Sequence, residues 1–171
     1  MPDIRGVVLG AVRHPDTDAY LVQRLSGTDE THFHRFIRGG IEHGEPSGVA
    51  LEREFREELG VAVDAGPVVC TVENLFEFGG DAHHELAVVR EATFADVSLY
   101  DRATFAGVDD ADEDGDPVEY EAYWRTPAEL READAPFLPA GIADALASDD
   151  HVHLVSPRGA DTAAVDGAAD T

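Results

Sequence analysis

The sequence predicts a mixed α/β sandwich. Two observations support this fold class: strand-like apolar runs occur before and after one helical segment, and that segment carries a single apolar stripe. The chain has 171 residues, of which 43% are hydrophobic, so it can bury a sizeable core despite its charge. We expect one folded domain over residues 1–155, followed by a mobile polar tail over residues 156–171.

Three strands are expected before the helix. Residues 4–13 and 20–24 are apolar and rich in β-branched side chains, and the turn-forming residues 14–18 lie between them. Residues 32–37 predict a third strand. We expect the sequence Arg-Gly-Gly at 38–40 to end it.

The strongest helix prediction covers residues 47–59. Leu51, Phe55 and Leu59 recur every four residues and form one apolar stripe. A Gly-Glu-Pro-Ser segment precedes the helix and offers Ser47 as a candidate cap. Gly60 follows where a C-terminal cap is expected.

The rest of the chain alternates between the two kinds of element. Four segments are strand-like: residues 68–78, 82–94, 118–124 and 151–155. Two segments look helical: residues 127–132 and 138–147. Residues 97–108 are ambiguous, and residues 109–116 are expected to form an acidic loop.

Charge narrows the choice of partners. Asp and Glu number 36 against 12 cations, which are all Arg, and the formal charge is −24. This composition resembles the proteomes of organisms that keep molar salt in the cytoplasm, where the Debye length is only about 3 Å. A surface this negative makes nucleic acids and anionic membranes unfavourable partners.

Targeting signals are not evident in the sequence. No apolar run approaches the roughly 18 residues that span a bilayer, and the N-terminal segment does not look like a secretory signal. Cys70 is the single cysteine, so no internal disulfide can form. We therefore expect a cytoplasmic protein without a membrane partner.

Three carboxylates share one face of the predicted helix. Glu54, Glu57 and Glu58 stand at positions i, i+3 and i+4, where like charges cost roughly 0.2–0.5 kcal/mol per pair. A hard divalent cation such as Mg²⁺ would offset that repulsion. Arg53 lies four residues before Glu57 and could hold its carboxylate. Taken alone, the three glutamates are more simply a solvated acidic face.

The surroundings of these glutamates change that interpretation. Their spacing with neighbouring residues completely matches the signature box of the Nudix hydrolases, at Gly39, Glu45, Arg53, Glu54, Phe55, Glu57, Glu58, Gly60 and Val61. The chain resembles this family closely in the box, and more loosely over residues 4–147. Family members usually carry Pro and Gly where this chain has Ile37 and Arg38.

The resemblance implies a fold and a reaction. The fold is an α/β/α sandwich with a mixed sheet, in which the box forms a loop, a helix and a loop. The reaction is attack of water on a phosphorus atom of a nucleoside diphosphate linked to another group. The implied cofactor is Mg²⁺, with Mn²⁺ as an alternative, and the implied partner is a small nucleotide-type substrate.

The resemblance also assigns roles to the box residues. Glu54, Glu57 and Glu58 would bind Mg²⁺, and the carbonyl of Gly39 would be a further ligand. Glu45 would support the metal shell, and Arg53 would orient a glutamate. The predicted site therefore consists of Gly39, Glu45, Arg53, Glu54, Glu57 and Glu58. The general base is either Glu54 or Glu57.

Substrate contacts lie outside the box. Because the chain has no Lys, substrate phosphates must be met by Arg or by metal, and Arg24 and Arg38 are the candidates. The alternative is that each pairs with surface acid. ADP-ribose-like compounds, nucleotide sugars, dinucleotide polyphosphates and oxidised nucleoside triphosphates all stay open as substrates. The oligomeric state is open too, with a homodimer as one option.

Three rival functions compete with hydrolysis. The same fold could serve as a nucleotide-metabolite binding or sensor module with little catalysis, although such a module need not keep Arg53 and the three glutamates. The acidic helix face could also be purely structural. An isomerase of isoprenoid diphosphates shares the fold, but no cysteine lies near the box.

An acidic segment after the box resembles a second motif. It has the spacing of an EF-hand calcium loop at Asp110, Asp112, Asp114, Gly115 and Glu121. Aspartate is abundant here, strong helices do not flank the segment, and Pro117 removes a backbone donor, so an acidic surface loop is favoured. A further alternative is that Glu113, Glu119 or Glu121 supplies a base.

The remaining histidines, the cysteine and several aromatic residues are interpreted mainly as structural. The His-x-His pairs at 32–34 and 151–153 are interpreted as half-buried histidines rather than Zn²⁺ ligands, because no third ligand lies nearby in sequence. The segment 83–85, His-His-Glu, is a candidate substrate contact. Cys70 is expected to be a core thiol. Packing is also expected for Tyr120, Tyr123 and Trp124, with stacking on a base as the alternative.

Overall fold

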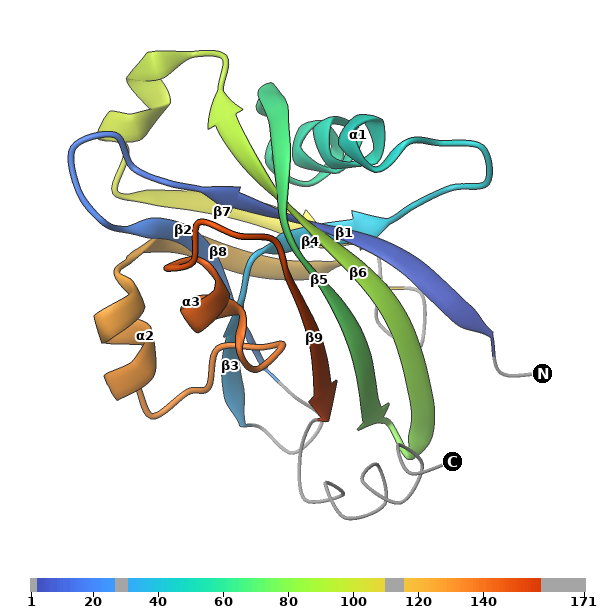
Figure 1. Cartoon of the computed structure of the whole chain (residues 1–171). Helices are drawn as coiled ribbons and strands as arrows, with labels where there is room; N and C mark the ends of the chain where they lie inside the picture. The colour runs from blue at the N-terminus through green and yellow to red at the C-terminus, as the bar shows by residue number, and fades with distance from the viewer. Residues whose placement is uncertain (1–2, 27–30, 110–115, 158–171) are drawn as a thin grey trace.

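The computed structural model describes residues 3–26, 31–109 and 116–157. Within these residues, nine strands form two sheets (Figure 1). The first sheet has the order β4-β1-β6-β5-β9, with bounds Ile37–Gly40, Ile4–Val12, Asp81–Phe94, Val63–Phe78 and Val152–Pro157. The second has the order β3-β2-β8-β7, with bounds His32–Arg35, Tyr20–Ser26, Val118–Arg125 and Thr104–Asp109.

The first sheet is mixed, as predicted. Strand β1 pairs in parallel with β6 and antiparallel with β4, while β5 pairs antiparallel with β6 and in parallel with β9. The second sheet is antiparallel throughout its described strands. The helical elements are α1 (Ser47–Leu59), α2 (Pro127–Glu132), α3 (Ile142–Ala145) and the 3₁₀ turn η1 (Val97–Asp101).

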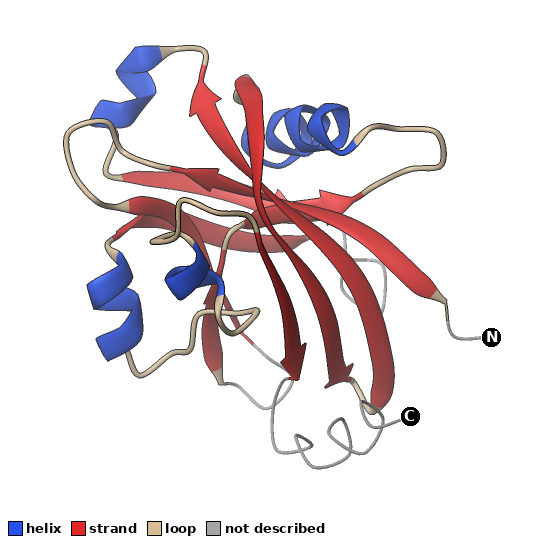
Figure 2. Ribbon diagram, viewed as in Figure 1, coloured by secondary structure: helices blue, strands red, loops and turns tan. Residues whose placement is uncertain are grey.

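Helices cover both faces of the strands, which gives an α/β/α sandwich (Figure 2). On one face, Val8 and Val12 of β1 belong to the apolar cluster that contains Phe55 of α1. On the other, Val7 and Leu9 belong to the cluster that contains side chains of α2 and α3. Strand β1 is therefore apolar on both sides, which explains why its sequence is a nearly continuous apolar run.

Helix α1 sits very close to β1 because of one glycine. A Cβ atom built on Gly10 would lie 2.7 Å from the ring of Phe55 and 3.0 Å from Leu51. Both side chains are fully buried. The predicted apolar stripe of α1 therefore packs directly on the backbone of β1.

The helix bounds agree with the prediction, but the cap does not. Gly60 ends α1 in the left-handed conformation, at φ 66°, as expected for a C-terminal glycine. At the other end Pro46 holds the cap position without a side-chain hydrogen bond. Ser47 is instead the first helical residue, and its Oγ accepts a hydrogen bond from Arg90 Nε at 2.9 Å. The prediction of a Ser47 cap was wrong.

The segment predicted as one strand over residues 32–37 is two strands in different sheets. Phe36, which is fully buried, lies between β3 and β4. The glycines expected to end this strand continue it, since Gly39 and Gly40 pair with Val8 and Val7 of β1. The missing side chain of Gly39 serves close packing against α1 rather than a turn.

The C-terminal half shows three further differences. The ambiguous residues 97–108 resolve into η1 and the greater part of β7. The helix predicted over residues 138–147 shortens to α3, because Gly141 holds a positive φ of 92° just before it. Strand β9 extends to Pro157, beyond the predicted strand end at 155, and the buried Ser156 Oγ accepts a hydrogen bond from Ala140 N. Residues 158–171 lie outside the described residues.

The expected core residues are largely in place. Cys70 is fully buried, Tyr120 is buried, and Trp124 packs against the core cluster under α1. Of the four paired histidines, only His34 is buried, whereas the other three are exposed. Among the described residues, no helix is long and apolar enough to cross a membrane.

Candidate active site

A cleft of about 820 Å³ opens beside the box helix α1, at strand β4. Three groups among its lining residues are relevant to function. Box residues on one side are Gly39, Gly40, Arg53, Glu54 and Glu57. Cations elsewhere in the lining are Arg5, Arg35 and Arg38. Rings in the lining are Phe33, Phe76, Phe78 and His83.

Arg53 organises the box through its whole guanidinium group. Its Nε and Nη2 donate to the two oxygens of Glu45, both at 2.9 Å. Its Nη1 donates to Glu54 Oε1 at 2.9 Å and to Glu57 Oε2 at 3.1 Å. Nη2 also donates to the carbonyl of Gly40 at 2.9 Å. These five bonds match the five N–H groups of an arginine, so the planar fork fixes all four partners.

Glu45 acts as the partner of Arg53. Besides these two bonds, its Oε1 accepts a hydrogen bond from the backbone N of Glu42 at 3.1 Å. The hydrogen bonds from Arg53 lower the pKa of Glu45 to about 2. Both of its oxygens are engaged, which suits the supporting role predicted for Glu45 better than direct metal ligation.

Glu54 lies against the backbone of β4. A Cβ atom built on Gly39 would overlap the carboxyl group of Glu54, so only glycine leaves room for it. Burial raises the pKa of Glu54, and the hydrogen bond and charge of Arg53 oppose this. The side chain is 15% exposed, whereas that of Glu57 is 50% exposed. A purely solvated acidic face therefore does not describe Glu54.

Glu58 lies deeper than the other two glutamates. It is buried, and its Oε1 accepts a hydrogen bond from the Tyr120 hydroxyl at 3.3 Å. Its Oε2 is buried without a hydrogen-bond partner among the described residues. Burial raises its pKa to about 9, and the negative charges of Asp109 and Glu54 contribute to this shift. Glu58 is thus a neutral carboxylic acid at pH 7 in the metal-free protein.

The described side chains do not already gather into a metal site of three or more His, Cys, Asp or Glu residues. The donor chemistry nevertheless fits a hard divalent cation. Glu54 and Glu57 each bind Arg53 through one oxygen only, and within the described part of the chain the buried Oε2 of Glu58 is without a partner. A cation bound by these carboxylates would also relieve their mutual repulsion and remove the proton from Glu58.

The sequence-predicted arginines have different positions. Arg38 lines the cleft, but both terminal nitrogens donate to Glu85, each at 2.6 Å. Burial alone would raise the pKa of Glu85, yet the Arg38 guanidinium and the Asn74 amide bring it below its usual value. Arg24 is exposed on β2 and does not line the cleft.

Arg35 lines the cleft and was not predicted from the sequence. It pairs with Gln23 across β2 and β3, whereas Arg24 pairs with His34, and neighbouring residues of a strand point to opposite faces. The sequence held part of the signal: alternation places Arg35 on the same face of the strand as the apolar Phe33, whereas the pairing of the strands decides which face borders the cleft. Arg5 and Asn74 were also missed as lining residues.

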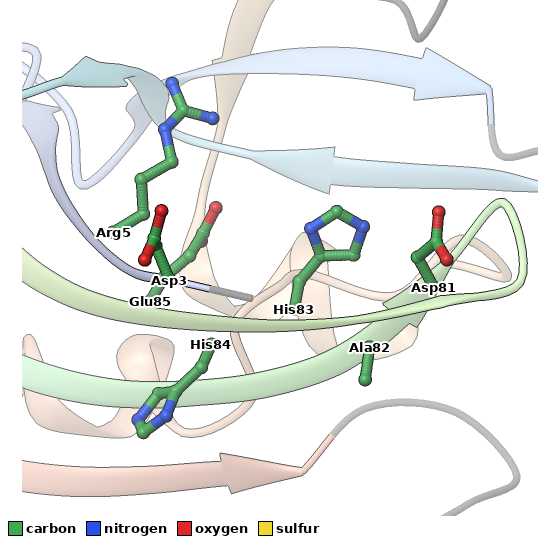
Figure 3. A pocket seen from close by; sticks show the side chains of 7 residues that line it. All are labelled: Asp3, Arg5, Asp81, Ala82, His83, His84 and Glu85. Atoms are coloured by element: carbon green, nitrogen blue, oxygen red, sulfur yellow. The ribbon is translucent and has the colours of Figure 1, made fainter. Parts of the chain in front are cut away.

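Aromatic rings form the far part of the cleft. His83 stacks on Phe76, with ring centroids 5.1 Å apart and planes inclined by 12°. A second hollow of about 500 Å³ adjoins this end and shares Arg5, His83 and Glu85 with the cleft. Figure 3 shows His83 pointing into this hollow and His84 pointing to the opposite side of its strand. The candidate segment 83–85 therefore contributes His83 and Glu85 to the cleft.

The structure describes only part of the EF-hand-like segment, and it shows the contacts of His153. Four of the five residues with EF-hand spacing lie outside the described residues, while Glu119 and Glu121 are exposed on β8. Glu113 also lies outside the described residues. His153 bridges Thr71 Oγ1, at 2.7 Å, and Glu73 Oε2, at 2.9 Å, on the neighbouring strand β5.

Comparison with known proteins supports the match seen in the box. The family model of the NUDIX domain matches residues 4–145. No curated protein matches the chain. Among solved structures, a NUDIX hydrolase from Nitrosomonas europaea has a TM-score of 0.58 at 15% identity, covering 85% of this chain and 87% of that chain.

Two further structures are similar. The MutT protein from Methanosarcina mazei Go1 has a TM-score of 0.55 at 18% identity, covering 85% of this chain and 92% of that one. The E. coli ORF135 protein has a TM-score of 0.54 at 22% identity, covering 85% and 90%. At these identities the likeness concerns the fold.

The fold and the assembled box define an enzyme of the Nudix hydrolase type. Since the family match spans most of the chain, the protein belongs to the Nudix family. The family and fold class predicted from the sequence are therefore confirmed.

Proposed function

We propose that this protein hydrolyses a pyrophosphate bond in a nucleoside diphosphate linked to another group, with Mg²⁺ as cofactor. The observation that carries the proposal is the set of five Arg53 hydrogen bonds: one each to the cleft carboxylates Glu54 and Glu57, two to Glu45 and one to the Gly40 carbonyl. A helix face without a binding function would not require such an arrangement.

We assign the following roles to the residues. Glu54, Glu57 and Glu58 would hold the metal, and the Gly39 carbonyl stays a predicted ligand. When bound, Mg²⁺ neutralises charge on the phosphates and lowers the pKa of a coordinated water. Arg53 keeps the carboxylates oriented, and Glu45 keeps Arg53 in place. Either Glu54 or Glu57 accepts a proton from the attacking water, because each has one oxygen that Arg53 does not bind.

The other end of the cleft suits the organic part of such a substrate. The stacked pair of Phe76 and His83 offers flat ring surface beside Arg5. A nucleobase stacks favourably on aromatic rings, by roughly 1–3 kcal/mol. A nucleotide-type substrate would therefore place its diphosphate at the box and its base among the rings. A buried lone thiol at Cys70 supports a reducing, cytoplasmic setting.

The test is a substrate panel assayed with Mg²⁺ and with Mn²⁺ at molar KCl. We expect release of a nucleoside monophosphate from at least one nucleoside diphosphate derivative. Glu57→Gln should remove most of this activity, whereas Glu132→Gln, at an exposed position on α2 and with the same change of charge, should not. Absence of turnover across the panel, together with tight nucleotide binding in calorimetry, would favour a binding module instead.

A further inference from the structure

Arg35 is paired more weakly than the other buried or half-buried arginines of the cleft. Its Nε donates to Gln23 Oε1 at 2.9 Å, and its Nη2 donates to Asp109 Oδ2 at a long 3.4 Å. Among the described residues these contacts use two of its five N–H groups. Arg53 uses all five, and Arg38 is held by two short bonds to Glu85.

The position of Arg35 is fixed before any ligand arrives. Gln23 is fully buried in β2, directly opposite Arg35 in the sheet register, so its Oε1 orients the guanidinium. The Arg35 side chain is only 15% exposed, and it lines the same cleft as Glu54 and Glu57. A guanidinium oriented in this way costs little further entropy when it binds an anion.

The charge of Arg35 is incompletely balanced. Burial and the nearby positive charge of Arg38 lower its pKa to about 9, against the opposing effects of Asp109, Glu58 and Glu85. Arg38 has a bidentate carboxylate partner of its own, while Arg35 has a neutral amide and one distant carboxylate. A buried cation with unused donors is stabilised when an anion supplies the missing bonds.

We propose that Arg35 binds a phosphoryl oxygen of the diphosphate substrate, whereas Arg38 stays paired with Glu85. The ligand class rests on the proposed function, whereas the assignment to Arg35 rests on its position in the cleft and on the weakness of its carboxylate pairing. Asp109 then competes with the substrate for the same guanidinium. This places the phosphate contact on β3, outside the box.

The experiment measures binding of inorganic pyrophosphate by calorimetry, with Mg²⁺ at constant ionic strength. Arg35→Gln should weaken binding about ten- to hundred-fold, the range for a charge-assisted hydrogen-bonded contact. Arg35→Lys keeps the charge but loses the fork, so it should give an intermediate loss. Arg13→Gln, which removes an exposed arginine paired with Asp18, is the matched control and should bind like the wild type.

A second variant tests the competition. Asp109→Asn should tighten pyrophosphate binding in the wild-type background and have little effect in the Arg35→Gln background, because the gain acts through Arg35. Circular dichroism checks that each variant folds; if Arg35→Gln does not fold, Arg35→Lys decides, both alone and as the background in which Asp109→Asn is measured. Unchanged affinity in Arg35→Lys, or no pyrophosphate binding by the wild type, overturns the assignment. A wild type that binds pyrophosphate through Arg35 but hydrolyses nothing on the panel would refute the proposed function alone.

Discussion

The carboxyl group of Glu54 lies in the space that a side chain at Gly39 would fill. The two residues come from different elements, the box helix α1 and the edge strand β4, yet a methyl group at position 39 would overlap the carboxylate directly. This contact joins the backbone of one element to the acid of the other. The separation of the two elements therefore depends on glycine at this position.

We expect Gly39→Ala to reduce kcat/KM by about 100-fold, the cost of displacing a reacting group by roughly 1 Å. The added methyl group must push the Glu54 carboxylate away from β4. Steady-state kinetics on an active member of the substrate panel measures the effect. Gly48→Ala is the control within α1, because its Cβ would make an ordinary 3.4 Å contact with Ala65.

The control variant Gly48→Ala should also be more stable than the wild type. Replacing a helical glycine by alanine without strain should stabilise the protein by about 0.5–1 kcal/mol. Urea unfolding would measure this gain. If Gly39→Ala retained full activity, the close approach of Glu54 to β4 would have no functional importance.

Arg53→Lys should lower activity by at least about 100-fold while the fold is kept. A lysine has the charge but cannot supply five N–H groups in one plane, so Glu45, Glu54 and Glu57 would no longer share one partner. Steady-state kinetics and Mg²⁺ titration would show the loss. Arg56→Lys, on the same helix but exposed, serves as the control.

The raised pKa of Glu58 predicts how the free energy of unfolding of the metal-free protein depends on pH. Its folded pKa of about 9 is above the unfolded value of about 4.3, so the folded state binds the extra proton between these values. The contribution is fully present below about pH 4.3, and it is lost as the pH rises towards 9. Urea unfolding with a chelator, from pH 5 to 9, should show this decline.

Two comparisons isolate that contribution. Glu58→Gln keeps a neutral polar group and should flatten the decline with pH. Addition of Mg²⁺ should also reduce it, since a cation would replace the proton on the carboxyl group. An equally steep decline in Glu58→Gln would assign the pH dependence to other groups.

Salt should stabilise the protein strongly. With a net charge of −24, self-repulsion weakens as the Debye length falls from about 10 Å at 0.1 M salt to about 3 Å at 1 M. A relief of a few kcal/mol would raise Tm by roughly 5–10 °C for a chain of this size. Thermal unfolding in KCl and in CsCl measures it, and the two salts should act alike if screening is the cause.

Helix α1 and the box could be predicted from the sequence because their signals lie within a short stretch of the chain. The Gly-Glu-Pro-Ser segment, the apolar stripe with Leu51 and Phe55, and Gly60 were enough to set the bounds of α1, and the box spacing was enough to single out Arg53 and the glutamates. The face to which a strand side chain points depends on pairing between distant segments, and this is why the sequence alone does not show that Arg35, rather than Arg24, lines the cleft. The break at Phe36, where the chain passes from β3 in one sheet to β4 in the other, also has no local signal. A buried aromatic residue occurs just as readily inside a single strand.

Gly10 of β1 also affects the position of the box helix α1. It sets the clearance between the box helix and the sheet, since the ring of Phe55 rests where a side chain of β1 would otherwise stand. Phe55 and Glu54 are adjacent in the helix, so a bulkier residue at position 10 would lift the acids away from β4 together with the ring. The hydrogen atom that Gly10 carries in place of a side chain thus sets the distance between the carboxylates of α1 and strand β4.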